Sequence, residues 1–384
     1  MARSKDIRRK KDILTEYKTP VKLCGSLIHK GYRLRPSTLS KARQEEDAYW
    51  KQSMKPYQDK GHEDYKWAIT EAERNATRLA DSICSAFATE FNPKSTFAIE
   101  SYNVDGRIEG SKSDLIIKEY DTGPGDALIS TRHFSLKAYE KDGNIQVCSG
   151  TYMSTLLSLA FHKVGVGQYM SAEGKKVPRA VVANIPAIAA LFGEDYSVDI
   201  APTLQCIKQL DANFKSLVQD RFPGKEAWKK ICSDTAYTAI PLMIKVCEIV
   251  KAQDPGAFKD KLLGMCGMDG QDEVVAVAGN KVYSTFGKPK AKEIVNRLNS
   301  PACVLNFCQN NQGIKWSFSD KAGPIYSIDM PLTINKNGAW WTEGTVGSAK
   351  NIHSKLPGEP REGKRNEIAT STNMWVKPRQ IFGE

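Results

Sequence analysis

The chain has 384 residues, of which 41% are hydrophobic and 26% are charged, a composition typical of a globular protein with a buried core. This composition excludes a disordered chain, a collagen-like fibre and a coiled-coil rod. No stretch reaches the roughly 18 uninterrupted apolar residues that a membrane span needs, and no apolar segment follows the charged start MARSKDIRRKK. We therefore expect an intracellular, cytoplasmic protein that has no membrane partner.

Charge is the most informative part of the composition. Lys and Arg total 55 against 44 Asp and Glu, which gives a formal net charge of +11. Most of the excess lies in residues 1–60, which carry 16 basic and 7 acidic side chains. Such a segment suits the phosphate backbone of a nucleic acid, although a solvated leader would show the same charge. The nine dispersed cysteines contain no CxxC pair and favour reduced thiols over disulfides or a zinc cluster.

The first predicted elements are an N-terminal extension and a helix. Residues 1–60 show only short periodic stretches among scattered proline, glycine and aromatic residues, so we expect a basic extension draped on the core. From Thr70 onward, apolar and small residues follow the helical period and predict an amphipathic helix that ends near Pro93. Thr70 and Glu73 have the spacing of a capping box at its start.

Strand-like runs follow this helix and are separated by turn-rich segments, which together predict an antiparallel meander. The three runs cover residues 96–102, 114–120 and 127–139. A fourth strand is predicted at 144–148 and a second helix at 155–161.

The second half of the chain has a different pattern. It is mostly helical by spacing up to about residue 265, with a break at Asp254-Pro255-Gly256. Strand character returns at 273–285, a helix is predicted at 288–298, and the remaining runs alternate as in a small sheet. We expect an α+β or α/β fold in four regions: a basic extension (1–60), a core (61–170), a helical region (171–270) and a mixed α/β to β-rich region (271–384).

The candidate chemistry lies on the predicted meander. Asp114 opens an apolar strand, and the next strand carries Ser135 and Lys137, which share one face because side chains alternate along a strand. A meander would bring Asp114 near that face. A carboxylate beside a lysine suits a divalent cation and the water that attacks a phosphodiester.

A helix followed by strands that carry Asp114 and Ser135-Leu136-Lys137 resembles the PD-(D/E)xK nuclease superfamily and its restriction-endonuclease-like fold, over about residues 62–165. The resemblance implies a DNA endonuclease that uses Mg²⁺, with Mn²⁺ as an alternative. In such an enzyme Asp114 binds the metal and Lys137 assists the attacking water. Two positions depart from the family pattern: Ser113 stands in place of proline, and Ser135 in place of the second acid.

The missing second acid must come from elsewhere, because serine is a poor ligand for Mg²⁺. The candidates are Glu73 on the predicted helix, Glu100 on the first strand and Glu140 shortly after Lys137. The resemblance favours Glu73 as the second metal ligand, since members of the family often place an acid on this helix. Ser135 would then contribute a supporting hydrogen bond.

Other residues are candidates for contact with nucleic acid. His133 shares the face of Ser135 by parity, and Gln146 on the next predicted strand could contact DNA or orient the lysine. Basic residues near the two ends of the chain suit contact with a backbone, and those after Trp375 stand beside an aromatic ring that could stack on a base. The predicted contacts are His133, Gln146, Lys10, Lys11, Lys377 and Arg379.

Several alternatives stay open at this stage. Asp114 and Lys137 would also suit an ordinary sheet, as a turn cap and an exposed lysine. A protein with a nuclease-like sheet but no second carboxylate could bind nucleic acid without cutting it, and an RNase would differ only in substrate. Cleavage of both DNA strands would imply a homodimer. No GxxxxGK[ST] phosphate loop is present, so we expect no nucleotide cofactor.

Overall fold

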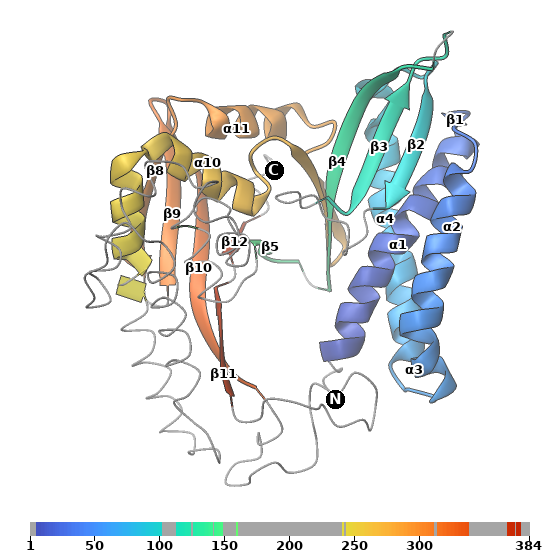
Figure 1. Cartoon of the computed structure of the whole chain (residues 1–384), viewed down its shortest axis with the longest axis horizontal. Coiled ribbons are helices and arrows are strands. Elements are labelled where there is room, and N and C mark those ends of the chain that lie inside the picture. The colour runs from blue at the N-terminus through green and yellow to red at the C-terminus, as the bar shows by residue number, and fades with distance from the viewer. Residues whose placement is uncertain are drawn as a thin grey trace, which may run out of the picture.

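The computed structural model describes residues 5–101, 113–123, 126–140, 142–148, 159, 240–241, 243–310, 313–337, 367–372 and 374–377. These residues form a mixed α+β fold that contains two β-sheets, with a layer of helices against the first sheet (Figure 1). The predicted helix at 155–161, apart from Leu159, and most of the helical region at 171–270 lie outside the described residues. No helix in the described part of the chain combines the length and the apolar character needed to cross a membrane.

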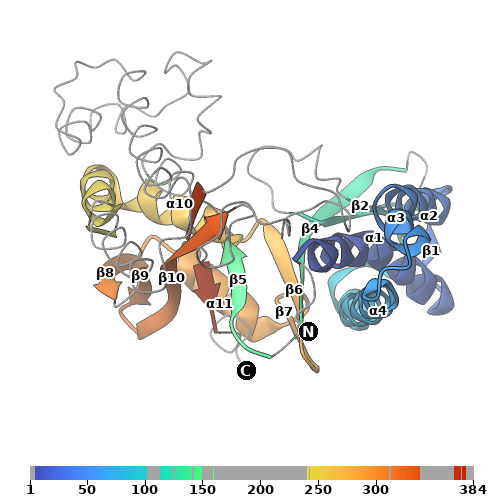
Figure 2. The ribbon, with the colours of Figure 1, turned by 90° about the horizontal axis from the view of Figure 1, so that it is seen from below.

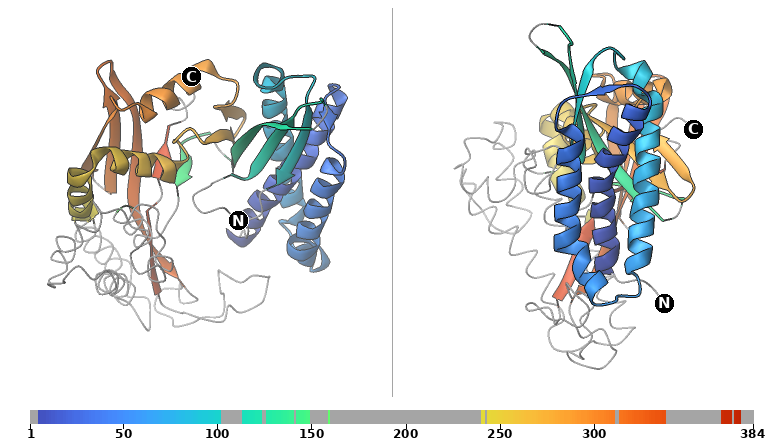
Figure 3. Two further views of the ribbon diagram at one scale, coloured as in Figure 1. Left: turned by 45° about the horizontal axis from the view of Figure 1, so that its top comes forward. Right: turned by 90° about the vertical axis from the view of Figure 1, so that its right-hand side faces the viewer.

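The N-terminal segment is helical and belongs to the core. Helix α1 (Lys5–His29) runs along α4 (Tyr65–Glu90), and α2 (Thr38–Tyr49) lies on the other side of α1 (Figure 3). A π-helical turn (Trp50–Met54) joins α2 to the short helix α3 (Lys55–Asp59). The expectation of a draped extension is therefore wrong. The periodic stretches on either side of Pro20 belong to one helix, whose apolar face is buried against α4.

Helix α4 confirms the predicted amphipathic helix but not its predicted start. It begins at Tyr65, so Thr70 and Glu73 lie inside the helix and form no capping box. Its buried face includes Ala72, Ala76 and Leu79, and the helix ends at Glu90, shortly before Pro93. Proline disfavours a helical conformation in the residue before it, which explains this end.

The first sheet has the strand order β1-β2-β3-β4-β6-β7. Its strands are β1 (Arg33–Leu34), β2 (Thr96–Ser101), β3 (Leu115–Tyr120), β4 (Leu128–Tyr139), β6 (Asp272–Ala278) and β7 (Lys281–Ser284). Strands β2, β3 and β4 form the predicted antiparallel meander, whereas β4 and β6 are parallel. The predicted boundary at residue 271 thus separates two strands that are hydrogen-bonded neighbours. Pairing between strands more than 130 residues apart leaves no local signal in the sequence.

The second sheet has the order β5-β12-β10-β9-β8, with β11 also paired to β10. Its strands are β5 (Ile145–Cys148), β8 (Val304–Asn310), β9 (Gly313–Asp320), β10 (Gly323–Asn337), β11 (Glu367–Thr372) and β12 (Met374–Val376). Strand β5 confirms the strand predicted at 144–148, but it pairs with β12 rather than with the meander. Helices α10 (Pro255–Cys266) and α11 (Pro289–Asn299) contact strands of this second sheet. Asp254 caps α10 at the predicted break.

Two apolar cores lie on opposite faces of the first sheet. Phe87 of α4, Phe134 of β4 and Val275 of β6 belong to the core between the sheet and the helical layer. On the other face, Val274 and Ala276 of β6 belong to the core shared with α10 and the second sheet. Figure 2 shows the helical layer and the second sheet on either side of β4 and β6. Strand β4 therefore has a bonded neighbour along each edge, β3 and β6, and its side chains are held in a fixed register.

Candidate active site

Asp114 and Lys137 are in contact on the first sheet. The carboxylate Oδ2 of Asp114 lies 3.4 Å from the Nζ of Lys137 and accepts a hydrogen bond of 2.7 Å from the backbone N–H of Leu136. Asp114 is only 5% exposed. The structure thus brings together the two residues that the sequence singled out.

The bend before β3 explains how this contact arises. The N–H of Asp114 donates to the carbonyl of Phe134 at 2.7 Å, and the ladder between β3 and β4 begins at the next residue, Leu115. The side-chain carboxylate takes the next N–H of β4, that of Leu136, which would otherwise be buried without a partner. Both side-chain contacts use Oδ2, so Oδ1 has no hydrogen-bond donor among the described residues.

Lys137 is a cation at neutral pH. Its Nζ also donates to the carbonyl of Leu136 at 3.1 Å, and its side chain is 28% exposed. Burial lowers the pKa of Lys137, but Asp114 and, more weakly, Tyr139 and Glu16 outweigh burial and hold the pKa above its usual 10.5. Lys137 is therefore suited to donate hydrogen bonds and to stabilise negative charge rather than to accept a proton.

A cavity of about 110 Å³ lies beside Lys137. Lys137 and Tyr139 line it from β4, and Asp12, Thr15 and Glu16 line it from α1. Burial raises the pKa of Asp12 above its usual 3.8, against the opposing effect of Lys11. The acids that share a cavity with the lysine therefore come from α1. Sequence reasoning missed them because it treated this segment as an extension, although its acids recur at the helical spacing of Asp12 and Glu16.

The structure brings none of the three predicted second acids to Asp114. Glu73, 42% exposed, forms ion pairs with Lys18, at 2.9 Å, and with Lys22, and these two lysines hold its pKa below 4.5 against the effect of burial. The reason is the orientation of α4, which turns Ala72 and Ala76 inward and leaves Glu73 beside α1. The other two acids pair elsewhere, Glu100 with Lys118 at 2.9 Å and Glu140 with Arg8 at 3.8 Å.

A second polar group adjoins Asp114. The Oγ of Ser113 lies 3.0 Å from the Nδ1 of His133 and donates a hydrogen bond of 3.1 Å to the Oδ1 of Asp272. His133 and Asp272 are register partners on the parallel strands β4 and β6. Ser135 is buried on the same face as His133. Asp272 was not recognised in the sequence because it belongs to a strand far along the chain.

The two lysines of α1 that were predicted to contact nucleic acid differ in exposure. Lys11 is 2% exposed, its Nζ lies 2.8 Å from the Oδ1 of Asp12, and it also sits 5.6 Å from the centroid of the Trp67 ring. Lys11 is thus engaged within the helical layer, and its contact with nucleic acid stays a prediction. Lys10 lies with its Nζ 5.8 Å from the centroid of the Tyr57 ring, and a contact between Lys10 and DNA stays a prediction.

The remaining predicted contacts are on the second sheet. The hydroxyl of Tyr139 donates to the carbonyl of Gln146 at 3.1 Å and accepts from its N–H at 3.0 Å, which links β5 to a residue that lines the cavity beside Lys137. Lys377 is exposed and directly follows β12. Arg379 lies outside the described residues.

The side chains at this site suit a metal ion for which the protein supplies only part of the coordination. Within the described ranges, no three or more His, Cys, Asp and Glu side chains gather as ligands of one metal ion. Mg²⁺ usually keeps several waters and binds through one or two carboxylates together with phosphates of the substrate. The Oδ1 atom of Asp114 can serve as one such ligand. The residues therefore fit Mg²⁺ on the condition that water and substrate supply most of its coordination.

Comparisons with known proteins add no relative. A scan against protein-family models and searches of curated proteins and of solved structures found no match to this chain.

Proposed function

We propose that the protein is a metal-dependent DNA endonuclease whose reaction centre is built on Asp114 and Lys137. The observation that carries this proposal is the 3.4 Å contact between the two side chains, beside a cavity of the first sheet. A helix followed by a meander that bears these two residues is also the arrangement implied by the resemblance to PD-(D/E)xK nucleases. This resemblance supports a restriction-endonuclease-like core of α4, β2, β3 and β4.

The side chains divide the work according to their charge. Asp114 would hold Mg²⁺ or Mn²⁺ through Oδ1, since Oδ2 is engaged by Leu136 and Lys137. When bound, such a cation lowers the pKa of its water and neutralises charge on a phosphoryl oxygen. The ammonium of Lys137 would orient the attacking water and stabilise the charge that develops on the phosphate.

Glu16 takes the place of the missing second acid in this proposal. It lines the same cavity as Lys137, and its charge contributes to the raised pKa of that lysine. Ser135 lies at the position of the family's second acid but is neutral and buried. A carboxylate delivered by α1 would restore the negative charge that the reaction centre needs.

A second candidate function is nucleic-acid binding without cleavage. It is favoured by the bond from the Leu136 N–H to Asp114, which gives this carboxylate a role in completing the β3–β4 ladder. In that case the contact with Lys137 would only stabilise the sheet, and the net charge of +11 would account for affinity.

Conversion of supercoiled plasmid in Mg²⁺ and in Mn²⁺ separates the two functions. Asp114→Asn and Lys137→Met should each lower the cleavage rate by about 10³-fold or more, because they remove charge at the reacting phosphate. DNA affinity, measured in Ca²⁺, should stay within a few-fold of that of the unmodified protein. A panel of duplex, branched and single-stranded DNA and RNA would define the substrate.

Lys118→Met is the matched control. Lys118 lies on the adjacent strand, is 30% exposed and pairs with the carboxylate of Glu100, so it resembles Lys137 in exposure and in having an acidic partner, but it does not contact Asp114 or line the cavity. Its replacement should leave cleavage intact. Binding without cleavage in any divalent metal would overturn the nuclease proposal and support the binding protein.

A further inference from the structure

Ser113, His133 and Asp272 form a hydrogen-bonded chain immediately beside Asp114. The hydroxyl of Ser113 lies 3.0 Å from the Nδ1 of His133 and donates to the Oδ1 of Asp272 at 3.1 Å. Ser113 is 1% exposed, so this chain is shielded from water at its centre. Three different segments supply it: the bend before β3, the middle of β4 and the start of β6.

The hydrogen bond that Ser113 donates to Asp272 indicates which ring nitrogen of His133 carries a proton toward Ser113. A serine hydroxyl has one proton, and here that proton points to Asp272. Ser113 must therefore accept at its oxygen the proton carried by the Nδ1 of His133. The Nε2 atom is then the ring nitrogen left for a further partner, and it makes no hydrogen bond within the described part of the chain.

The charged groups near His133 on this face of the sheet come from several elements. They are Asp272 of β6, Asp114 before β3, Lys137 farther along β4, and the ion pair between Lys118 of β3 and Glu100 of β2. The β3 residue opposite His133 is Ile116, which is apolar.

The position of His133 relative to Asp114 suggests its task. His133 and Lys137 are four residues apart on one face of β4, which places their backbones about 13 Å apart. Asp114 lies between them, since its N–H pairs with Phe134 and its carboxylate reaches Leu136. In phosphoryl transfer the attacking and leaving oxygens lie roughly in line, on opposite sides of phosphorus.

From this geometry we infer that His133 is the proton donor to the leaving group of the phosphodiester, with Ser113 and Asp272 as its positioning residues. This inference rests on the proposed nuclease function. Water forms a new bond to phosphorus at the Lys137 side while the bond from phosphorus to the deoxyribose oxygen breaks at the His133 side. The Nε2 proton passes to that oxygen, the attacking water releases one proton to solvent, and the imidazole is reprotonated from solvent.

The test is the pH dependence of plasmid cleavage by the full-length protein in Mg²⁺, measured in single turnover. A histidine acid gives a rate that falls on the alkaline side of the profile. His133→Gln should lower the maximal rate by about 10² to 10⁴-fold and abolish this alkaline limb. Its affinity for DNA in Ca²⁺ should change little, which distinguishes a role in the chemical step from a role in binding.

Two further variants keep the imidazole and test its positioning. Ser113→Ala and Asp272→Asn should each lower the rate by about 10-fold. Both should also displace the alkaline limb, because the ring loses the hydrogen-bond partners that orient its proton. These variants answer the question even if His133→Gln fails to fold, and loss of a merely structural bond would not displace the limb.

His29→Gln is the matched control, since His29 is exposed in the last turn of α1, away from the first sheet's polar face. Its profile should match that of the unmodified protein. An unchanged profile in His133→Gln, or limbs that stay in place in Ser113→Ala and Asp272→Asn, would overturn this inference while Lys137→Met still abolishes cleavage. Absence of cleavage in the unmodified protein would instead remove the proposed function itself, and this inference with it.

Discussion

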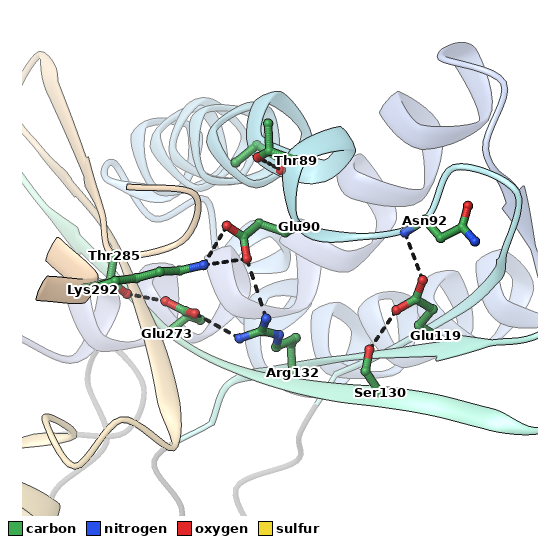
Figure 4. A network of polar contacts seen from close by, with 10 residues as sticks. Thr89, Glu90, Asn92, Glu119, Ser130, Arg132, Glu273, Thr285 and Lys292 are labelled. Atoms are coloured by element: carbon green, nitrogen blue, oxygen red, sulfur yellow. Dashed lines mark hydrogen bonds and ion pairs between the residues drawn. The ribbon is translucent and has the colours of Figure 1, made fainter. Parts of the chain in front are cut away.

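The two faces of strand β4 carry polar groups of very different kinds, at neighbouring positions. Arg132 points toward the helical layer and lies 3.5 Å from both Glu90 of α4 and Glu273 of β6 (Figure 4). Lys292 of α11 completes this network with bonds of 2.6 and 2.7 Å to Glu90. His133, the next residue of β4, faces the opposite side and belongs to the chain that adjoins Asp114.

The network around Arg132 is balanced in charge and joins four elements of the fold, whereas the group around Lys137 lines a cavity. Two carboxylates meet two cations in the first, and Thr285 donates to Glu273 at 2.6 Å. The network joins α4, β4, β6 and α11, which is what a structural brace requires. Beside Lys137, by contrast, Asp114 on the sheet and Glu16 in the cavity act on one ammonium. Ionisable groups with shifted pKa values beside a cavity are the pattern expected of a site that receives a ligand.

The largest effect that this comparison predicts concerns the acid supplied by α1. We expect Glu16→Gln to lower the rate of DNA cleavage by about 10² to 10³-fold, because it removes a charge that acts during the reaction. The fold should survive, since the substitution changes one atom and keeps the side-chain volume. Plasmid cleavage in single turnover measures the rate, and circular dichroism checks the fold.

Glu73→Gln is the comparison variant for this prediction. Glu73 pairs with Lys18 and Lys22 on the surface of the helical layer, so its loss should leave the cleavage rate within about twofold. If Glu73→Gln were the variant that lost activity and Glu16→Gln the one that kept it, the assignment of the second acid would revert to the helix glutamate implied by the family resemblance.

The next prediction concerns the Arg132 network on the helical side of β4. Arg132→Met should lower the free energy of unfolding by about 1–2 kcal/mol, because it leaves the nearly buried carboxylate of Glu273 without its cation. Urea unfolding measures this change. Cleavage by the folded variant should keep the kcat of the unmodified protein, and a loss of kcat at full stability would show that this network belongs to the active site after all.

A smaller effect is expected in the titration of Lys137. Its pKa lies above 10.5 in the folded protein, because Asp114, together with Tyr139 and Glu16, outweighs burial. The stabilisation linked to this shift is complete below pH 10.5 and is lost as the pH rises through the raised value. In Asp114→Asn the burial remains and the main opposing charge is gone, so the pKa should fall.

Reductive ¹³C-methylation of the lysines followed by NMR can measure this titration, with Lys137→Met to identify the signal. Lys118 offers an internal reference, since Glu100 raises its pKa and that pair is untouched by the substitution. A Lys137 signal that titrates at the same pH in both proteins would show that Asp114 does not control the charge of this lysine.

The parts of the fold that the sequence predicted are those whose signal is local. The helix with Ala72, Ala76 and Leu79 on one face and the three strands after it follow from residues at fixed short spacings. Asp114 and Lys137 came together for the same reason, because a meander links strands that follow one another along the chain. Their contact needed no information from outside residues 96–139.

The parts that the sequence missed depend on distant segments. Glu16 reaches the cavity only because α1 packs along α4, and a proline in the middle of α1 had divided its pattern into short stretches. Asp272 reaches Ser113 through a parallel pairing of β4 with β6, which joins regions placed in different domains. Glu73 was misjudged because a helical wheel shows which residues are polar but not which neighbour they meet.

The smallest predicted effect separates two lysines that the sequence had placed in one class. Lys377 is exposed after β12, while Lys11 is buried between Asp12 and Trp67. Removing one lysine that binds a phosphate reduces the slope of log affinity against log salt by about 1. If Lys377 contacts DNA, Lys377→Gln should show this reduction in filter binding at several salt concentrations, whatever the DNA sequence.

Lys11→Met should instead leave the salt slope unchanged and lower the free energy of unfolding, because Asp12 loses its partner at 2.8 Å. The methionine keeps most of the buried chain that packs near Trp67, so the decrease in stability reports the charge rather than the packing. A reduced salt slope in Lys11→Met with an unchanged unfolding curve would mean that this end of α1 opens when DNA binds. The basic surplus of the first 60 residues would then act on the substrate directly, rather than by holding α1 against the helical layer.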